Sequence, residues 1–265
     1  MACERKAPRV ALAAVSTILV VSLVALIFLL GVQGVALNID LWQKQWEHLG
    51  IDDETNMSRE DLLRAARTLV SYFEGKIESP QIRVVIDGRE RALYGWREIR
   101  HLADVRELYR KGVFLRNGLY VTVPGLVGLA FVLWRMTQSD RQPGPGRREL
   151  SPVKARKTPV AASDSLRDFV RFCLARIALF AGVAVLVLAL LLAVPAVADF
   201  SDWWTAFHRI SFSNDLWLLD PSTEWLVKMF PLEFFFAIMT VLWRRVVVAG
   251  LLLTLAGGLG GKAIT

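Results

Sequence analysis

The sequence predicts an α-helical integral membrane protein with four transmembrane helices and a small, mainly α-helical extracytoplasmic domain that includes a short β-hairpin. Of its 265 residues, 54% are hydrophobic, whereas soluble domains contain roughly 45–50% apolar residues. The mean hydropathy is +0.40. Apolar stretches recur that reach the length of about 20 residues that a membrane span needs.

Four apolar stretches define the expected spans. They lie at residues 10–37, 113–134, 172–198 and within 232–261. The first is too long for the apolar core of a signal peptide. Arg244 and Arg245 interrupt the fourth, so we expect an interfacial segment before this pair and a deeper span after it. One tilted helix would fit nearly as well.

The distribution of basic residues predicts the topology, because cytoplasmic loops of membrane proteins are enriched in Lys and Arg. Residues 1–9 and the linker 135–171 are basic, with Arg5, Lys6, Arg9, Arg141, Arg147, Arg148, Lys154, Arg156 and Lys157. We therefore expect both segments and the C-terminus, 262–265, to be cytoplasmic, and 38–112 and 199–231 to be extracytoplasmic. The net charge of +7 then indicates contact with anionic lipid of the inner leaflet and not nucleic-acid binding.

The segment 38–112 has the pattern of a small folded domain. Ser58–Asp61 resembles a helix-capping box, and apolar residues follow it at helical spacing. Gln81–Ile86 and Arg91–Tyr94 flank Asp87-Gly88, a dipeptide that favours a tight hairpin turn. From Trp96 a helical stripe leads into the second span.

The segment 199–231 is unusually polar and aromatic for a connector between spans. We expect a loop that carries a functional site, since few of its stretches are periodic over the length of a helix. Its tryptophans suit the lipid headgroup region, because an indole is partly apolar and partly polar. They are Trp203, Trp204, Trp217 and Trp225.

The chain has only three histidines, and two of them are candidates for a site. His48 has no arranged neighbours and indicates an ordinary interfacial residue. His101 and Asp104 are i,i+3 neighbours on one expected helix face, where the carboxylate can orient the ring. His208 precedes a polar run that includes Asn214. The predicted topology places His101 and His208 just outside the membrane, which favours a shared site.

The residue pattern leaves three classes of function open. The first is acyl transfer with a histidine as general base. The second is a metal-dependent membrane hydrolase, in which Asp104 or Asp215 would join the two histidines as ligands. The third is a non-catalytic membrane scaffold or sensor. Both cysteines, Cys3 and Cys173, fall on the cytoplasmic side, so no thiol nucleophile is expected outside.

Three segments carry a resemblance to a known family: His101–Val105, Phe207–Pro221 and Met229–Phe235. With the four-span layout, they resemble the integral membrane family of lipoprotein intramolecular transacylases. The resemblance implies an enzyme of the bacterial plasma membrane that acts on diacylglyceryl-modified lipoproteins among membrane lipids. It implies transfer of the sn-2 acyl chain to the α-amino group of the N-terminal Cys, which gives a lyso-form lipoprotein. No cofactor and no metal are expected, and the oligomeric state is left open.

The family's two functional histidines match His101 and His208. The substrate amine, with a pKa of about 7.7–8.0, must lose a proton before it attacks. We expect His101, oriented by Asp104, to be the general base and His208 to donate to the oxyanion or the leaving oxygen. The reverse assignment is nearly as plausible. The expected orienting or substrate-binding residues are Asp104, Arg209, Asn214, Asp215, Trp217 and Asp220.

Overall fold

The computed structural model describes residues 7–139 and 162–262, which fall into two compact units. Unit 1 contains the described residues of the ranges 1–27, 117–187 and 247–265, and unit 2 contains 28–116 and 188–246. Several expected cytoplasmic residues lie outside the described residues, among them Cys3, Arg5, Lys6, Arg141, Arg147, Arg148, Lys154, Arg156, Lys157 and the C-terminal residues 263–265.

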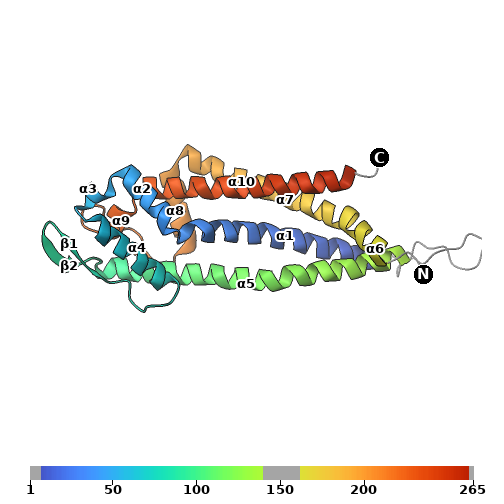
Figure 1. The fold of residues 1–265 in the computed structure, drawn as a ribbon, viewed down its shortest axis with the longest axis horizontal. Coiled ribbons are helices and arrows are strands. Elements are labelled where there is room, and N and C mark those ends of the chain that lie inside the picture. Colours follow the sequence, from blue (N-terminus) through green and yellow to red (C-terminus); the bar gives the residue numbers. More distant parts are fainter. Residues whose placement is uncertain (1–6, 140–161, 263–265) are drawn as a thin grey trace, which may run out of the picture. The chain divides into compact units, whose positions relative to one another are not determined.

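Within the described residues, four helices are long and apolar enough to cross a membrane, which confirms the predicted fold class. They are α1 (Ala7–Ala36), α5 (Trp96–Ser139), α7 (Ala175–Ala198) and α10 (Leu232–Lys262) (Figure 1). The helix α6 (Ala162–Asp168) and the π-helix η1 (Phe169–Leu174) lead directly into α7. The limits of the membrane-embedded parts stay predictions.

Helix α5 has 44 residues, about twice the length that a membrane span needs. Its apolar stretch is 113–134, whereas the turns before Lys111 carry many acidic and basic side chains. Because charged side chains are costly in lipid, we place only the apolar part of α5 in the membrane. His101 therefore lies on the polar extension of this helix.

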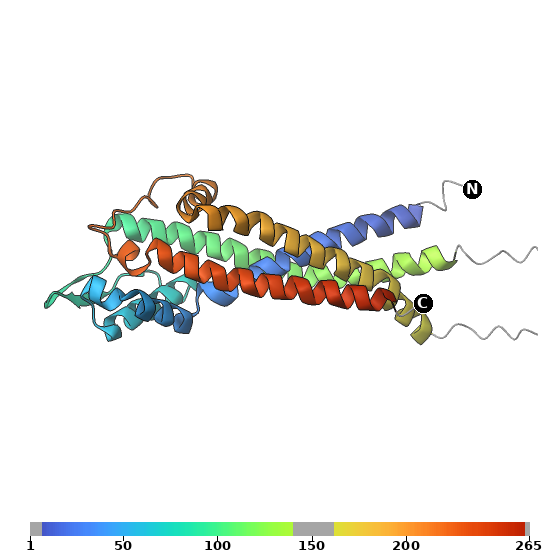
Figure 2. The ribbon, with the colours of Figure 1, turned by 90° about the horizontal axis from the view of Figure 1, so that it is seen from above.

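Within unit 1, α7 and α10 pack closely through glycines (Figure 2). A Cβ at Gly182 or Gly257 would collide with the backbone of the facing helix, and one at Gly250 would lie 3.0 Å from side-chain atoms of Leu186. Small residues allow such close approach between membrane helices. A second cluster joins α1, α5 and η1 through Val15, Ala130, Trp134 and Phe169.

The fourth expected span lies in one helix that continues through Arg244 and Arg245 without a break; which part of it is interfacial stays a prediction. Arg245 extends from α10, and its Nη1 donates a hydrogen bond to the Gly34 carbonyl at 2.8 Å. Gly34 lies in the last turn of α1, where carbonyls lack helical partners. The arginine therefore satisfies a helix end and leaves the backbone of α10 intact.

In unit 2, three short helices form the small domain that follows α1. They are α2 (Ile39–Leu49), α3 (Ile51–Thr55) and α4 (Arg59–Phe73). Ser58 caps α4 as predicted, because its Oγ accepts a hydrogen bond from the Asp61 N–H at 3.1 Å. Helix α4 packs against α2, and both helices bury one face, which on α2 carries Trp42 and Trp46.

The predicted hairpin is confirmed, with strands β1 (Arg83–Ile86) and β2 (Arg89–Ala92) paired antiparallel. The strands are shorter than the sequence indicated. Asp87 and Gly88 have φ values of 51° and 72°, and two consecutive positive φ angles are the requirement of the type I′ turn that fits hairpin twist.

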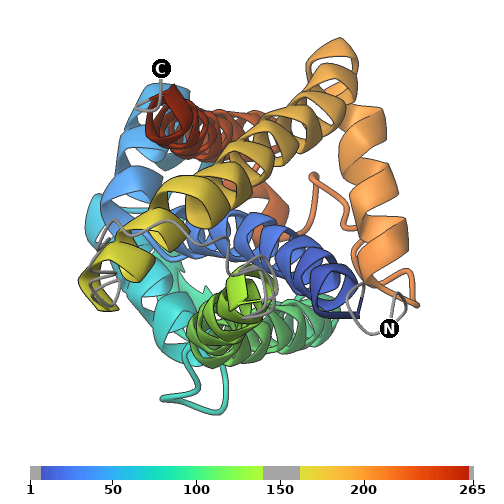
Figure 3. The same ribbon diagram turned by 90° about the vertical axis from the view of Figure 1, so that its right-hand side faces the viewer.

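The segment expected to be a loop contains two helices, α8 (Phe200–Ser211) and α9 (Trp225–Met229). The carboxylate of Asp199 caps α8 by accepting from the Asp202 N–H at 3.0 Å. Helix α8 runs across the direction of α10 (Figures 1 and 3). The structure differs from the expected loop because the aromatic residues at 200, 203, 204 and 207 follow helical spacing, whereas the tryptophans among them were interpreted only as headgroup residues.

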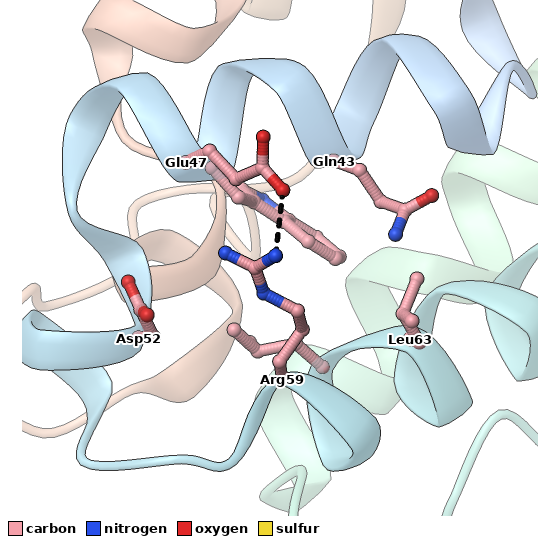
Figure 4. Close-up of a pocket in the computed structure, with 7 residues that line it drawn as sticks. Gln43, Glu47, Asp52, Arg59 and Leu63 are labelled. Carbon is pink, nitrogen blue, oxygen red and sulfur yellow. Dashed lines mark ion pairs between the residues drawn. The ribbon is translucent and has the colours of Figure 1, made fainter.

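A shallow hollow opens between α2 and α4, where Arg59 and Glu47 form an ion pair at 2.9 Å (Figure 4). Its lining includes Gln43, Asp52 and Leu63 but no histidine. The candidate catalytic residues therefore lie elsewhere in unit 2.

Candidate active site

Helices α5 and α8 bring His101 and His208 together, although 107 positions separate them along the chain. Their ring centroids are 6.0 Å apart, with an angle of 35° between the ring planes. Both side chains are buried, with 7% and 6% of their surface exposed. At this separation, one small substrate group can lie within hydrogen-bond reach of both rings.

The hydrogen bond of His208 identifies which ring nitrogen carries the proton. Its Nδ1 lies 2.8 Å from the carbonyl oxygen of Trp204, one turn earlier on α8. Because a carbonyl can only accept, Nδ1 is the donor, and Nε2 of the neutral ring keeps its lone pair. The helix thus holds His208 in the tautomer whose free nitrogen can accept a proton.

Aromatic side chains enclose His208. The ring of Trp204 packs edge-on at 4.6 Å between centroids, and that of Trp217 lies tilted at 5.0 Å. Phe212 contacts both histidines, with centroid distances of 5.2 Å to His101 and 5.6 Å to His208. These contacts exclude water from the imidazoles on several sides.

His101 does not have the hydrogen bond that the sequence predicted. The Oδ2 of Asp104 instead accepts from the Nδ2 of Asn214 at 3.0 Å, and the Nδ1 of His101 is buried without a hydrogen-bond partner among the described residues. A buried N–H without an acceptor is rare in proteins, so the environment favours the tautomer in which Nδ1 of His101 carries no proton.

The environment keeps both imidazoles neutral at physiological pH. The pKa of His101 is lowered to about 4, first by burial and then by the nearby His208, while the Asp104 carboxylate partly opposes the shift. Burial also lowers the pKa of His208, and its hydrogen bond to the Trp204 carbonyl partly opposes that shift. A neutral imidazole can accept a proton at one nitrogen and donate from the other.

Two contacts fix the segment after α8 to the polar part of α5. One is the bond between Asn214 and Asp104, and the second joins Arg97 Nη2 to the Asp215 carbonyl at 2.8 Å. The Oδ1 of Asn214 also accepts from the Leu216 N–H at 3.0 Å. Asn214 therefore connects the histidine helix α5 to the turn that positions Trp217.

A buried glutamate ties the start of α5 to the start of α9. Glu98 is 2% exposed, and its two carboxylate oxygens accept from the N–H groups of Gly95 and Leu226, both at 2.6 Å. The end of α9 is held in turn by Trp46, whose Nε1 donates to the Met229 carbonyl at 2.7 Å. These bonds form a rigid frame around the helix that carries His101.

Not every predicted site residue joins this arrangement. Arg209 is exposed and bonds to neither histidine among the described residues, and the side chain of Asp215 is exposed while its carbonyl makes the contact. Asp220 accepts hydrogen bonds from Ser222 within its own turn. The sequence analysis missed Arg97 and Phe212. Arg97 precedes the histidine by one helical turn, a spacing that could have drawn attention to it.

Loss of Asn214 is expected to lower the catalytic rate of the site strongly and the stability of the fold moderately. Asn214→Ala removes the bonds to Asp104 and to the Leu216 N–H, and we expect a loss of about 1–2 kcal/mol in unfolding free energy. Displacement of catalytic groups by about 1 Å can cost roughly 100-fold in rate. Turnover and the midpoint of thermal unfolding should be measured together, with Ser213→Ala as the neighbouring control. Equal activity of both variants would show that this link does not position the site.

No group of three or more His, Cys, Asp or Glu side chains within residues 7–139 and 162–262 is arranged to bind a metal ion. The Asp104 carboxylate, which acts electrostatically on His101, is hydrogen-bonded to the amide of Asn214.

Comparison with known proteins identifies the family. The family model of the lipoprotein intramolecular transacylase Lit matches residues 17–235, most of the chain. The chain belongs to the Lit family. As a Lit family member it is a membrane acyltransferase, a lipoprotein intramolecular transacylase. A comparison with curated proteins found no significant match.

Solved structures of Lit from Bacillus cereus share the fold. One in meso structure has 15% sequence identity and a TM-score of 0.63, and the match covers 92% of each chain. Structures of two variants of that protein, with a histidine replaced by arginine or by alanine, have TM-scores of 0.61 and 0.60 at the same identity. They cover 94% of this chain and 92% or 93% of their own. The Lit fold thus extends over nearly the whole chain.

Proposed function

We propose that this Lit family member moves the sn-2 acyl chain of a diacylglyceryl lipoprotein to the α-amino group of its N-terminal cysteine. The product is a lyso-form lipoprotein with an N-acyl and an S-monoacylglyceryl group. The observation that carries the proposal is the pair of buried, neutral imidazoles of His101 and His208, whose ring centroids are 6.0 Å apart. His101 lies on the polar extension of α5, and His208 lies on α8. One ring of such a pair can move the proton from the amine to the leaving oxygen, and the other can donate a hydrogen bond to the oxyanion.

His208 is the general base in this mechanism. The amine first loses one proton to solvent and attacks the ester carbonyl carbon as the neutral form. As the N–C bond forms, Nε2 of His208 takes the second amine proton. The same proton then passes to the glycerol oxygen as the C–O bond breaks, so the ring ends neutral. The bond from Nδ1 to the Trp204 carbonyl orients the ring throughout and stabilises the imidazolium.

His101 donates a hydrogen bond to the oxyanion of the tetrahedral intermediate. Its Nδ1 is buried without a partner, and a buried N–H without an acceptor is rare in proteins. We therefore place the ring proton on Nε2, where it can reach the substrate. This assignment reverses the sequence-based one, because the fixed tautomer belongs to His208 and the Asp104 carboxylate binds Asn214.

The mechanism needs no covalent acyl-enzyme. Amine and ester belong to the same substrate molecule, and well-oriented intramolecular reactions reach effective molarities of about 10⁵–10⁸ M. The site therefore acts by holding the two groups together, excluding water and moving one proton. The same exclusion of water by Trp204, Trp217 and Phe212 protects the ester from hydrolysis.

We place this site on the extracytoplasmic side of a bacterial plasma membrane, with both termini in the cytoplasm. The support is the distribution of Lys and Arg along the sequence. Aromatic contacts support an interfacial position for α8, since Trp203 packs against Trp243 of α10 at 6.2 Å between ring centroids, and tryptophan favours the headgroup region.

Mass spectrometry of a lipoprotein's N-terminal lipopeptide tests the proposal. The purified protein is incubated in lipid with a diacylglyceryl lipopeptide that carries a distinct acyl chain at the sn-2 position. We expect that chain to appear on the amine with the total mass unchanged. Loss of one fatty acid would instead indicate a hydrolase. An unchanged lipopeptide beside folded protein would favour a scaffold or sensor.

The transfer rate is expected to rise with pH across the titration of the substrate amine, near a pKa of about 7.7–8.0. Neither histidine should add a limb near the ordinary pKa of 6.5, because burial lowers both values. Initial rates between about pH 6 and pH 9 measure this profile. An acid limb centred at 6.5 would show that the reacting histidine is solvated and would contradict the buried pair.

The lowered pKa of His101 also makes the stability of the folded protein depend on pH. Because the folded protein holds His101 neutral down to about pH 4, the unfolded chain binds more protons below pH 6.5. Stability from this residue is therefore complete above pH 6.5 and is lost as the pH falls toward 4. Thermal unfolding in acid should show a smaller loss for His101→Gln than for the unchanged protein.

A further inference from the structure

Unit 1 contains a large cavity that the proposed reaction does not use. Its volume is about 1040 Å³, at the upper end of the sizes typical of ligand pockets. It is bounded by α1, the end of α5, and η1 with the first turns of α7. The polar and charged lining residues are Arg9, Ser16, Thr17, Thr137, Gln138, Asp168, Cys173 and Arg176.

The two ends of the cavity differ in polarity. Arg9, Gln138 and Asp168 lie at one end, whereas Val21 and Phe180 lie at the other, further toward the middle of the spans, and polar and apolar residues alternate between them. Arg9 to Val21, like Asp168 to Phe180, covers about 18 Å at the helical rise of 1.5 Å per residue. A charged end and an apolar end at this separation match a lipid headgroup and an acyl chain.

The charges that line the cavity favour an anion. Two arginines, Arg9 and Arg176, face one carboxylate, Asp168. Both arginines are exposed along their helices, so their long side chains can extend to the headgroup level while their stems cover apolar surface. A guanidinium binds phosphate with two parallel hydrogen bonds, which a lysine does not.

The wall formed by η1 departs from regular helix. The N–H of Ala175 bonds to the carbonyl of Val170, five residues earlier, and such π turns occur frequently at functional sites. Phe169 of this turn is buried in the cluster with Trp134, while Phe172 and Cys173 line the cavity. The wider turn thus places one aromatic ring in the core and opens the next residues toward the cavity.

We propose that this cavity binds one anionic phospholipid. Arg9 and Arg176 hold its phosphate, Thr17 and Gln138 contact the headgroup and glycerol region, and one acyl chain follows Val21, Ile177 and Phe180. With the topology proposed above, the lipid comes from the cytoplasmic leaflet, where anionic lipids attract basic segments. The lipid site is separate from the histidine pair and stabilises unit 1.

Cys173 provides a direct probe, because it lines the cavity and is half-buried. In a Cys3→Ser background it is the single thiol of the chain. Alkylation of Cys173 by a small neutral maleimide is followed in detergent micelles that contain dioleoyl phosphatidylglycerol or dioleoyl phosphatidylcholine at equal mole fraction. We expect the anionic lipid to slow alkylation strongly and the zwitterionic lipid to slow it little.

Two matched pairs of arginine substitutions distinguish binding of the lipid in the cavity from general attraction of an anionic lipid to a basic protein. Arg9→Gln with Arg176→Gln should weaken protection by phosphatidylglycerol at least about tenfold, since each charge-assisted contact contributes roughly that factor. Arg135→Gln with Arg171→Gln removes two exposed arginines that do not line the cavity and should leave protection unchanged. Native mass spectrometry of the same variants counts retained lipid independently.

Two results would overturn the proposal. Equal protection by both lipids would mean that Cys173 senses ordinary surrounding lipid. Equal weakening by both pairs of arginine substitutions would mean that net charge, not the cavity, attracts the anion. If the lipid-free thiol does not react, the number of phosphatidylglycerol molecules retained in native mass spectrometry decides between the same outcomes. None of these readouts depends on acyl transfer.

Discussion

Replacing His208 with asparagine is expected to lower the acyl-transfer rate by about 10²–10⁴-fold, the usual contribution of a general base. The asparagine amide nitrogen lies close to the place of the imidazole Nδ1 and can still donate to the Trp204 carbonyl, which His208 contacts at 2.8 Å. Nothing then occupies the place of Nε2, which takes the proton. The variant should therefore fold and bind substrate but fail in catalysis.

A glutamine at the same position provides the contrast. His208→Gln extends its amide toward the place of Nε2 and loses the bond to Trp204, so it should be inactive and also less stable. Single-turnover conversion, followed by mass spectrometry of the lipopeptide, gives the rate, and thermal unfolding gives the stability. His48→Asn, on the exposed face of α2, is the control. If His208→Asn kept a tenth or more of the rate, the base would be another residue.

Much of the fold can be predicted from the sequence because a membrane span is recognised by the length of its apolar stretch. A helix in lipid satisfies its own backbone hydrogen bonds, so apolar length predicts the apolar parts of α1, α5, α7 and α10, but not the polar extension of α5 or the continuity of α10. The hairpin follows from Asp87 and Gly88, whose positive φ angles few other residue pairs adopt without strain. Both signals are local, and neither needs knowledge of distant contacts.

Helix α8 shows where local signals were misread. Its aromatic residues pack against α10, since Trp204 stacks on Phe235 at 4.3 Å between centroids and Trp203 meets Trp243 at 6.2 Å. Phe200, Trp203, Trp204 and Phe207 are spaced i, i+3, i+4 and i+7, so they share one apolar face of the helix. The cap at Asp199 and the spacing of Phe200, Trp203, Trp204 and Phe207 were present in the sequence.

The candidate histidines could be selected from the sequence, but their tautomers could not. Asp104 is three residues from His101 and suggested a bond that local spacing permits. Its observed partner, Asn214, lies 110 residues away, and no local pattern predicts which of two acceptable donors a carboxylate will meet. The partner of His208 is a backbone carbonyl, which every residue has, so the sequence carries no mark of it.

Replacing His101 with alanine is expected to lower the rate by about 10²–10³-fold, the typical loss when one oxyanion donor is removed.

The double variant His101→Ala with His208→Asn decides whether the two rings act on one transition state. Groups that act as a unit give strongly non-additive losses, so the double variant should be hardly slower than the slower single variant. Two independent roles would instead multiply the losses. The 6.0 Å between the rings predicts coupling, because a substrate oxygen held by one ring leaves the reacting nitrogen within reach of the other. Single-turnover rates of the four proteins at one pH complete this cycle. Multiplied losses would show that His101 and His208 serve separate steps or separate sites.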